Sequence, residues 1–209
     1  MILGVLFDFD GTLIDTMKKF QILAGQILFE TYQIPIKEGE KLYLETSGVA
    51  FERQIEIICP NGEKNKETVA RFEREKLLDI QHEKFDNDVL LTFQKLKEKN
   101  IKTGISSGNY LSVMEDFLKK EPLDLDVVMG HEPHFEKGKA HFEYFLQKTN
   151  LKKENILFVG DSIKDGERAY DFGIPFIAKE GIFDKNRFLK EFGKNQKTIQ
   201  KISEVLLYI

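Results

Sequence analysis

Short apolar runs separated by helix-like segments restrict the fold of this chain more than any other feature. Two of them, Ile2–Phe7 and Ile156–Val159, are rich in branched side chains and are typical of strands buried on both faces. Similar runs lie near Ile101, near Val127 and at Ile174–Ala178. Short apolar strands that alternate with helices favour a parallel sheet. The sequence therefore predicts an α/β fold with a doubly wound, Rossmann-like parallel sheet.

Acidic residues follow two of these predicted strands. Asp8 and Asp10 come directly after the first, and Asp161 and Asp165 follow the run that ends at residue 159. Ligands of open α/β sheets bind at the carboxyl ends of the strands. Clustered carboxylates are costly unless a cation compensates them, and oxygen ligands without nearby Cys or His pairs favour Mg²⁺. We expect these four residues to form a Mg²⁺ site, although each alone is also compatible with helix capping.

A third predicted strand ends in hydroxyl side chains. Ser106 and Ser107 precede a helix expected to begin near Tyr110. Hydroxyls and free backbone N–H groups at a helix N-terminus can bind an anion, whereas in isolation this segment is more typical of ordinary capping. Beside a metal site, a phosphate-binding role is favoured. Either Lys137 or Lys139 would add a positive charge to it.

The region between the first two of these motifs has the periodicity of helices. Its apolar residues recur at helical spacing in three stretches. They are Met17, Phe20, Leu23, Ala24, Ile27 and Leu28, then Phe51, Ile55 and Ile58, and then Val69, Phe72, Leu77 and Ile80. We therefore expect residues 16–85 to form a helical cap inserted into a catalytic core of residues 1–15 and 86–209. The closing residues 199–209 are expected to form an amphipathic helix.

One loop of this helical region is a candidate for substrate contact. Gly48 joins two expected helices, and glycine permits backbone conformations that other residues resist. Arg53 follows it, and the arginine fork suits a second phosphate or a carboxylate. The alternative for Arg53 is a solvated surface arginine, which is the commoner case.

The composition of the chain bears on its partners and on its cellular compartment. The 209 residues carry a net charge of −4, which gives no electrostatic reason to expect nucleic-acid binding. The single cysteine, Cys59, excludes an internal disulfide and favours an intracellular setting. No apolar run has membrane-spanning length, and the first residues form a strand rather than a signal peptide. We expect a cytoplasmic protein without a membrane or nucleic-acid partner; its oligomeric state is left open.

Together, the four segments resemble the motifs of the haloacid dehalogenase superfamily, in its phosphatase and β-phosphoglucomutase-like branch with a helical cap. Asp8–Thr12 is similar to the first motif, Ser106 to the second and Gly160–Asp165 to the fourth, and a lysine between them completes the family order. The first and last motifs are highly specific. The resemblance spans nearly the whole chain.

This resemblance implies a role for each residue. Asp8 would be the nucleophile and Asp10 the general acid and base. Asp8, the backbone carbonyl of Asp10 and Asp161 would hold Mg²⁺, with Asp165 in its first or second coordination shell. Ser106 would bind the phosphoryl group, with Ser107 beside it. Lys137 is favoured as the motif lysine, and Lys139 remains admissible on spacing.

The implied activity is that of a Mg²⁺-dependent phosphatase acting on a small phosphorylated metabolite, such as a phosphoglycolate, a sugar phosphate or a nucleotide. A β-phosphoglucomutase-like phosphomutase is the alternative, because it uses the same pair of acids. A non-catalytic binding protein on the same fold is a third possibility, against which four idle carboxylates argue because they would reduce stability. Dehalogenases and phosphonatases are disfavoured because those relatives lack the acid found at Asp10.

Overall fold

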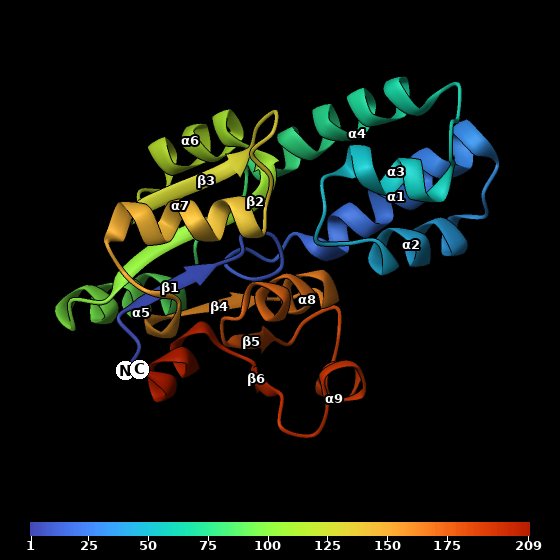
Figure 1. Cartoon of the computed structure of the whole chain (residues 1–209). Coiled ribbons are helices and arrows are strands. Elements are labelled where there is room, and N and C mark those ends of the chain that lie inside the picture. Colours follow the sequence, from blue (N-terminus) through green and yellow to red (C-terminus); the bar gives the residue numbers. More distant parts are fainter. The chain divides into compact units, whose positions relative to one another are not determined.

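The computed structural model describes all 209 residues, and the chain divides into two compact units (Figure 1). One unit consists of Met1–Asp15 and Lys84–Ile209, and the other consists of Thr16–Glu83. The sequence placed the boundaries after residues 15 and 85, and in the structure they follow residues 15 and 83. The first unit contains every strand, and the second is helical.

A six-stranded parallel sheet forms the centre of the first unit, with the order β3-β2-β1-β4-β5-β6. The strands are β1 (Gly4–Phe7), β2 (Lys102–Tyr110), β3 (Val127–His131), β4 (Ile156–Gly160), β5 (Phe176–Lys179) and β6 (Lys197–Ile199). The strand order reverses between β1 and β4, and doubly wound sheets bind ligands at such a point. The predicted α/β fold with a doubly wound parallel sheet is confirmed.

Helices cover both faces of this sheet (Figure 1). They are α5 (Asn87–Glu98), α6 (Leu111–Lys120), α7 (Lys139–Thr149), α8 (Ile163–Phe172) and α9 (Lys185–Phe192), with the 3₁₀ helices η1 (Lys153–Asn155) and η2 (Ile202–Tyr208). Successive side chains of a strand point to opposite faces. Leu6 of β1 therefore joins the core that includes Phe142 of α7, whereas Phe7 packs against Phe93 of α5, with ring centroids 4.9 Å apart.

The core on the α7 face is rich in aromatic rings and is almost fully buried. Phe142 lies 5.1 Å from Phe158 of β4 and 5.2 Å from Phe172 of α8, measured between ring centroids. Burying one large apolar side chain contributes roughly 1.5–3 kcal/mol. This packing fixes α7 and α8 on the sheet, so the residues at their first turns are held against the strand ends.

The end of the chain differs from the sequence prediction. Residues 197–199 form β6, which pairs with β5, and the segment that follows is the 3₁₀ helix η2 rather than an amphipathic α-helix. Ile199 is buried in the sheet, and Ile202 and Val205 are buried in η2. A 3₁₀ helix repeats every three residues. Ile202 and Val205 are three residues apart, a spacing that fits both a 3₁₀ helix and an α-helix. The predicted amphipathic α-helix was wrong because this spacing alone does not distinguish the two kinds of helix.

The second unit contains α1 (Met17–Tyr32), α2 (Ile36–Glu45), α3 (Phe51–Ile58) and α4 (Asn65–Ile80). The three expected apolar stretches lie in α1, α3 and α4. Aromatic rings form the centre of this unit: Phe51 and Phe72 stack at 3.8 Å, and Tyr43 and Phe20 pack around Phe72. No helix of either unit combines the length and the apolar composition needed to cross a membrane.

Candidate functional site

Two neighbouring strands bring the first acidic residues together. Because β1 and β4 pair in parallel register, with Phe7 opposite Val159, Asp8 and Asp161 emerge at the same edge of the sheet. Both residues are buried, with exposed fractions of 5% and 3%. Asp165, in the first turn of α8, completes the group. One carboxylate oxygen from each of the three residues lies within 4.8 Å of the others.

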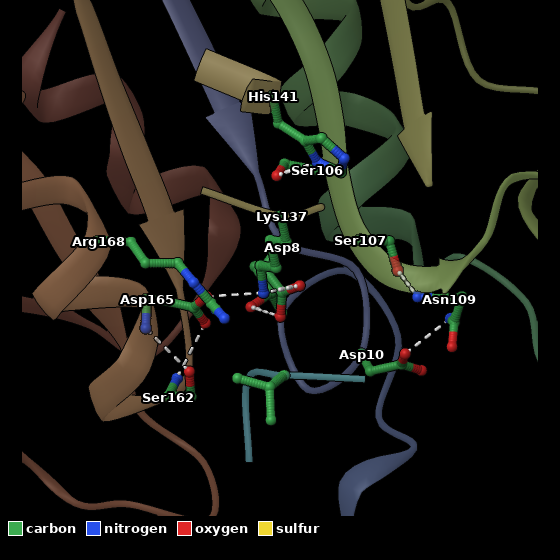
Figure 2. A network of polar contacts seen from close by, with 12 residues as sticks. Asp8, Asp10, Ser106, Ser107, Asn109, Lys137, His141, Ser162, Asp165 and Arg168 are labelled. Atoms are coloured by element: carbon green, nitrogen blue, oxygen red, sulfur yellow. Dashed lines mark hydrogen bonds and ion pairs between the residues drawn. The ribbon is translucent and has the colours of Figure 1, made fainter. Parts of the chain in front are cut away.

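Lys137 lies among these carboxylates (Figure 2). Its Nζ is 2.6 Å from Oδ1 of Asp8 and 2.6 Å from Oδ1 of Asp165, and only 5% of its side chain is exposed. Burial acts to lower the pKa of Lys137, but the charges of Asp165 and Asp8 outweigh it and raise that pKa. Lys139, by contrast, is largely exposed and lies 3.8 Å from Glu143.

Gly138 separates the two lysines and explains their different environments. Its φ of 117° lies in a region that side-chain-bearing residues rarely adopt, and a Cβ there would approach Cδ of Arg168 to 2.9 Å. The backbone thus turns at Gly138, so that Lys137 enters the site before α7 begins. Arg168 packs beside this turn and lies 4.0 Å from Asp165.

The three carboxylates carry more negative charge than Lys137 can neutralise. Burial is the largest cause that raises the pKa of Asp8 to about 6, with Lys137 opposing it. Burial also raises the pKa of Asp161 well above its usual value, and the carboxylates of Asp8 and Asp165 add to this shift. A divalent cation would relieve the repulsion, and oxygen ligands without cysteine or histidine suit a hard cation such as Mg²⁺. The residues present therefore fit the expected metal.

Asp165 is held by the protein on both sides. Its backbone N–H donates to Oγ of Ser162 at 3.1 Å, and the Ser162 N–H donates to Oδ2 of Asp165 at 3.3 Å, which forms a capping box at the start of α8. The other oxygen contacts Lys137. A Cβ on Gly160 would lie 2.6 Å from Oδ2 of Asp165. The run Gly160–Asp165 thus packs tightly enough to orient this carboxylate.

Asp10 lies apart from the group of three carboxylates. The chain turns at Gly11, where φ is 78°, and the Asp10 carboxylate accepts a hydrogen bond from Nδ2 of Asn109 at 2.7 Å (Figure 2). The sequence anticipated four clustered carboxylates, but the structure groups only Asp8, Asp161 and Asp165. Asn109 was not singled out as a site residue, although its place two residues after Ser107 was a usable signal.

The serines lie in β2 rather than at a helix cap. Because β2 continues to Tyr110, no side chain caps α6, and the helix-capping alternative is wrong. Ser107 Oγ accepts a hydrogen bond from the Asn109 N–H at 3.0 Å. Ser106 Oγ lies 2.9 Å from Nδ1 of His141, a residue that the sequence analysis left unassigned. Burial is the largest cause that lowers the pKa of His141 to about 4.

The two residues proposed for substrate contact lie in the helical unit. Gly48 has a φ of 88° in the loop between α2 and α3, as expected for a glycine that permits an unusual turn. Gln54 supports that loop, because its Nε2 donates to the Val49 carbonyl at 3.1 Å. Arg53 is exposed on α3. A role for Gly48 and Arg53 in substrate binding stays a prediction.

Comparison with known proteins gives one family. Residues 5–179 match the family model of the haloacid dehalogenase-like hydrolases. Among curated proteins, the chain is 29% identical over 188 residues to a candidate pyrophosphatase, PpaX, of Caldanaerobacter subterraneus subsp. tengcongensis. The match covers 85% of this chain and 81% of that protein.

Solved structures share the whole fold. A candidate phosphoglycolate phosphatase of Lactobacillus plantarum is 18% identical, with a TM-score of 0.78 and 100% of each chain covered. CbbY of Rhodobacter sphaeroides, solved with xylulose-1,5-bisphosphate, is 16% identical, with a TM-score of 0.73 over 98% of this chain and 96% of its own. At these identities the likeness establishes the fold.

The burial of Asp161 beside two other carboxylates predicts a pH-dependent stability. The pKa of Asp161 is higher in the folded protein than in the unfolded chain, so its favourable contribution to folding is complete only below about pH 4 and is lost as the pH rises through the folded pKa. Asp161→Asn has no proton to lose. In EDTA it should melt higher than wild type at about pH 8, by roughly 2–4 °C per kcal/mol gained, and differ little near pH 4.

Thermal unfolding of both proteins at the two pH values measures this effect. Asp171→Asn, at an exposed position of α8, is the matched control and should melt like wild type at both. An equal gain for Asp161→Asn at both pH values, or a lower melting temperature at the higher pH, would contradict the proposed repulsion.

Proposed function

Because the chain belongs to the haloacid dehalogenase-like hydrolase family and is therefore a hydrolytic enzyme, we propose that it is a Mg²⁺-dependent phosphatase of a small phosphorylated metabolite. The observation that carries this proposal is the buried contact between Lys137 and Asp8, beside Asp161. A carboxylate that attacks a phosphate dianion needs such positive charge nearby, because both reactants are anions.

Asp8 is the proposed nucleophile. Its ionised carboxylate would attack phosphorus while the bond from phosphorus to the leaving oxygen breaks, and a phosphoryl group becomes bonded to Asp8. Lys137 would offset the charge of both groups. Mg²⁺, held by Asp8, Asp161 and the Asp10 carbonyl, would supply further positive charge to the phosphoryl oxygens. Asp165 would orient Lys137 through the ion pair described above.

Asp10 is the proposed general acid and base. In the first step its carboxyl proton would pass to the leaving oxygen, and in the second its carboxylate would accept a proton from the attacking water. The bond between phosphorus and Asp8 then breaks, which releases inorganic phosphate and restores the Asp8 carboxylate. The hydrogen bond from Asn109 supports this assignment, since it holds the Asp10 carboxylate apart from the metal-binding group.

Ser106 and Ser107 would bind the phosphoryl group, because they follow Ile105 of β2, which pairs with Phe7 of β1, the residue before Asp8. The helical unit of residues 16–83 would act as the cap that recognises the rest of the substrate. Within it, Gly48 and Arg53 are the proposed contacts. The guanidinium of Arg53 suits a second phosphate or a carboxylate.

A panel of phosphorylated compounds tests the proposal. It should include phosphoglycolate, sugar phosphates, a sugar bisphosphate, nucleotides and inorganic pyrophosphate, with free phosphate and isomerised sugar measured in parallel. We expect phosphate release that falls to background after chelation, returns with Mg²⁺ and is poorly supported by Ca²⁺, whose looser coordination would misplace Asp8. Full turnover in chelator would contradict the metal requirement. Isomerisation without phosphate release would indicate a phosphomutase instead.

The two lysines provide a matched pair of variants. Lys137→Ala should lower kcat on the order of 10²–10³-fold, because it removes a buried charge from the reacting groups. Lys139→Ala should keep nearly full activity, because that side chain is exposed. Steady-state kinetics measures both, and Lys137→Met serves as a second variant if Lys137→Ala folds poorly. The reverse order of effects would transfer the role to Lys139.

The two acids of the first motif should fail at different steps. Asp8→Asn removes the nucleophile, so no phosphoryl adduct should form. Asp10→Asn keeps the nucleophile but removes proton transfer, which slows turnover on the order of 10²–10⁴-fold. With p-nitrophenyl phosphate, whose leaving group needs little acid assistance, the phosphorylated enzyme should accumulate in Asp10→Asn. Intact-protein mass spectrometry after an acid quench detects it, and an adduct on Asp8→Asn would overturn the mechanism.

A further inference from the structure

A buried histidine contacts the proposed phosphate-binding serine. His141 lies in the first turn of α7, and its Nδ1 is 2.9 Å from Oγ of Ser106. Both residues are completely buried, with 0% of each exposed. Figure 2 shows the imidazole beside Ser106, on the opposite side of that residue from Asp8. His141 therefore reaches the reaction centre only through Ser106.

The second ring nitrogen of His141 is also buried. Nε2 is buried and has no hydrogen-bond partner, and the ring of Phe135 packs over the imidazole at 4.6 Å between centroids. The backbone carbonyls of Gly130 and Phe135 lie near the ring and act to raise the pKa of His141. The environment of the ring therefore admits both neutral tautomers, and the role of Ser106 decides between them.

Charge keeps this ring neutral. Burial and the neighbouring positive charge of Lys137 both disfavour the imidazolium and lower the pKa of His141. The turn at Gly138 and the first turn of α7 thus place Lys137 beside Asp8 and His141 beside Ser106. Lys137 arrives as a cation, and His141 arrives as a neutral donor or acceptor.

The tautomer decides what Ser106 can do. A serine hydroxyl has one hydrogen to donate and two lone pairs to accept with. If Nδ1–H donates to Oγ, the hydroxyl hydrogen is free to point at a phosphoryl oxygen. If Nδ1 instead accepts from the hydroxyl, Ser106 presents lone pairs to an anion, which is repulsive. A phosphate-binding Ser106 requires the first arrangement.

We propose that His141 is a positioning residue for Ser106: its Nδ1–H donates to Oγ and directs the serine hydroxyl toward the phosphoryl group of the substrate. This inference rests on the proposed phosphatase function for its consequence in catalysis. It adds a residue outside the four motifs.

The tautomer is measured directly, without substrate or metal. Long-range proton–nitrogen correlation NMR of histidine-labelled protein at neutral pH distinguishes the two neutral forms. The chain has four histidines, and the signals that disappear in His141→Asn belong to His141. We expect the Nδ1–H form. The Nε2–H form would overturn the proposal.

Two substitutions test the consequence for phosphate. His141→Asn keeps an amide donor near the position of Nδ1, and His141→Leu removes it at similar volume. His141→Leu should weaken inorganic phosphate binding and lower kcat/KM roughly 10- to 100-fold, as expected for one hydrogen bond to a charged group. His141→Asn should recover most of this loss. Phe135→Leu, which alters packing on the imidazole without touching Ser106, should lower the melting temperature but leave kcat/KM nearly unchanged.

A double-mutant cycle separates positioning from a structural effect. In Ser106→Ala, the further change His141→Leu should have little effect on kcat/KM or on phosphate affinity, because the hydroxyl that it orients is absent. Equal losses from His141→Leu with and without Ser106 would overturn the proposal. If wild type neither binds phosphate nor turns over any phosphorylated compound, the proposed function fails. The NMR result still decides the assignment of His141 in that case.

Discussion

Three buried carboxylates around one lysine constrain the rest of this structure. Asp8, Asp161 and Asp165 repel one another in a poorly solvated site, and the single positive charge of Lys137 does not neutralise them. Burying unbalanced charge costs several kcal/mol per ion even after relaxation. Such an arrangement persists only where a rigid frame enforces it. Here that frame is the β1–β4 strand pair, the capped start of α8 and the turn at Gly138.

The frame acts through close packing. The sheet edge at the reversal of strand order aligns Asp8 with Asp161, since β1 and β4 are paired throughout their length. The absence of a side chain at Gly160 allows the Asp165 carboxylate to approach the backbone. Aromatic packing beneath α7 and α8 then holds these short contacts against repulsion. Packing in the core thus holds together a group of charges that repel one another.

Neutral residues complete the site from outside the charged group. Asn109 binds the carboxylate of Asp10, and His141 contacts the hydroxyl of Ser106. Each partner restricts a side chain that would otherwise rotate freely at a loop or strand end. Orientation of donors and acceptors before substrate arrives reduces the reorganisation needed during reaction. These neutral contacts thus orient Asp10 and Ser106 beside the charged group.

The sequence alone determined the α/β fold and the acidic strand ends. Apolar runs followed by Asp8 and Asp161 specify parallel strands whose carboxyl ends meet. Only the tertiary structure decided which lysine enters the site. Lys137 and Lys139 are two residues apart, and the backbone turn at Gly138 between them leaves the first buried and the second exposed. The sequence also did not predict that Asn109 contacts Asp10 or that His141 contacts Ser106, because both contacts join residues far apart in the chain. Local patterns record periodicity and strand ends, whereas burial and long-range hydrogen bonds arise only when the chain is packed.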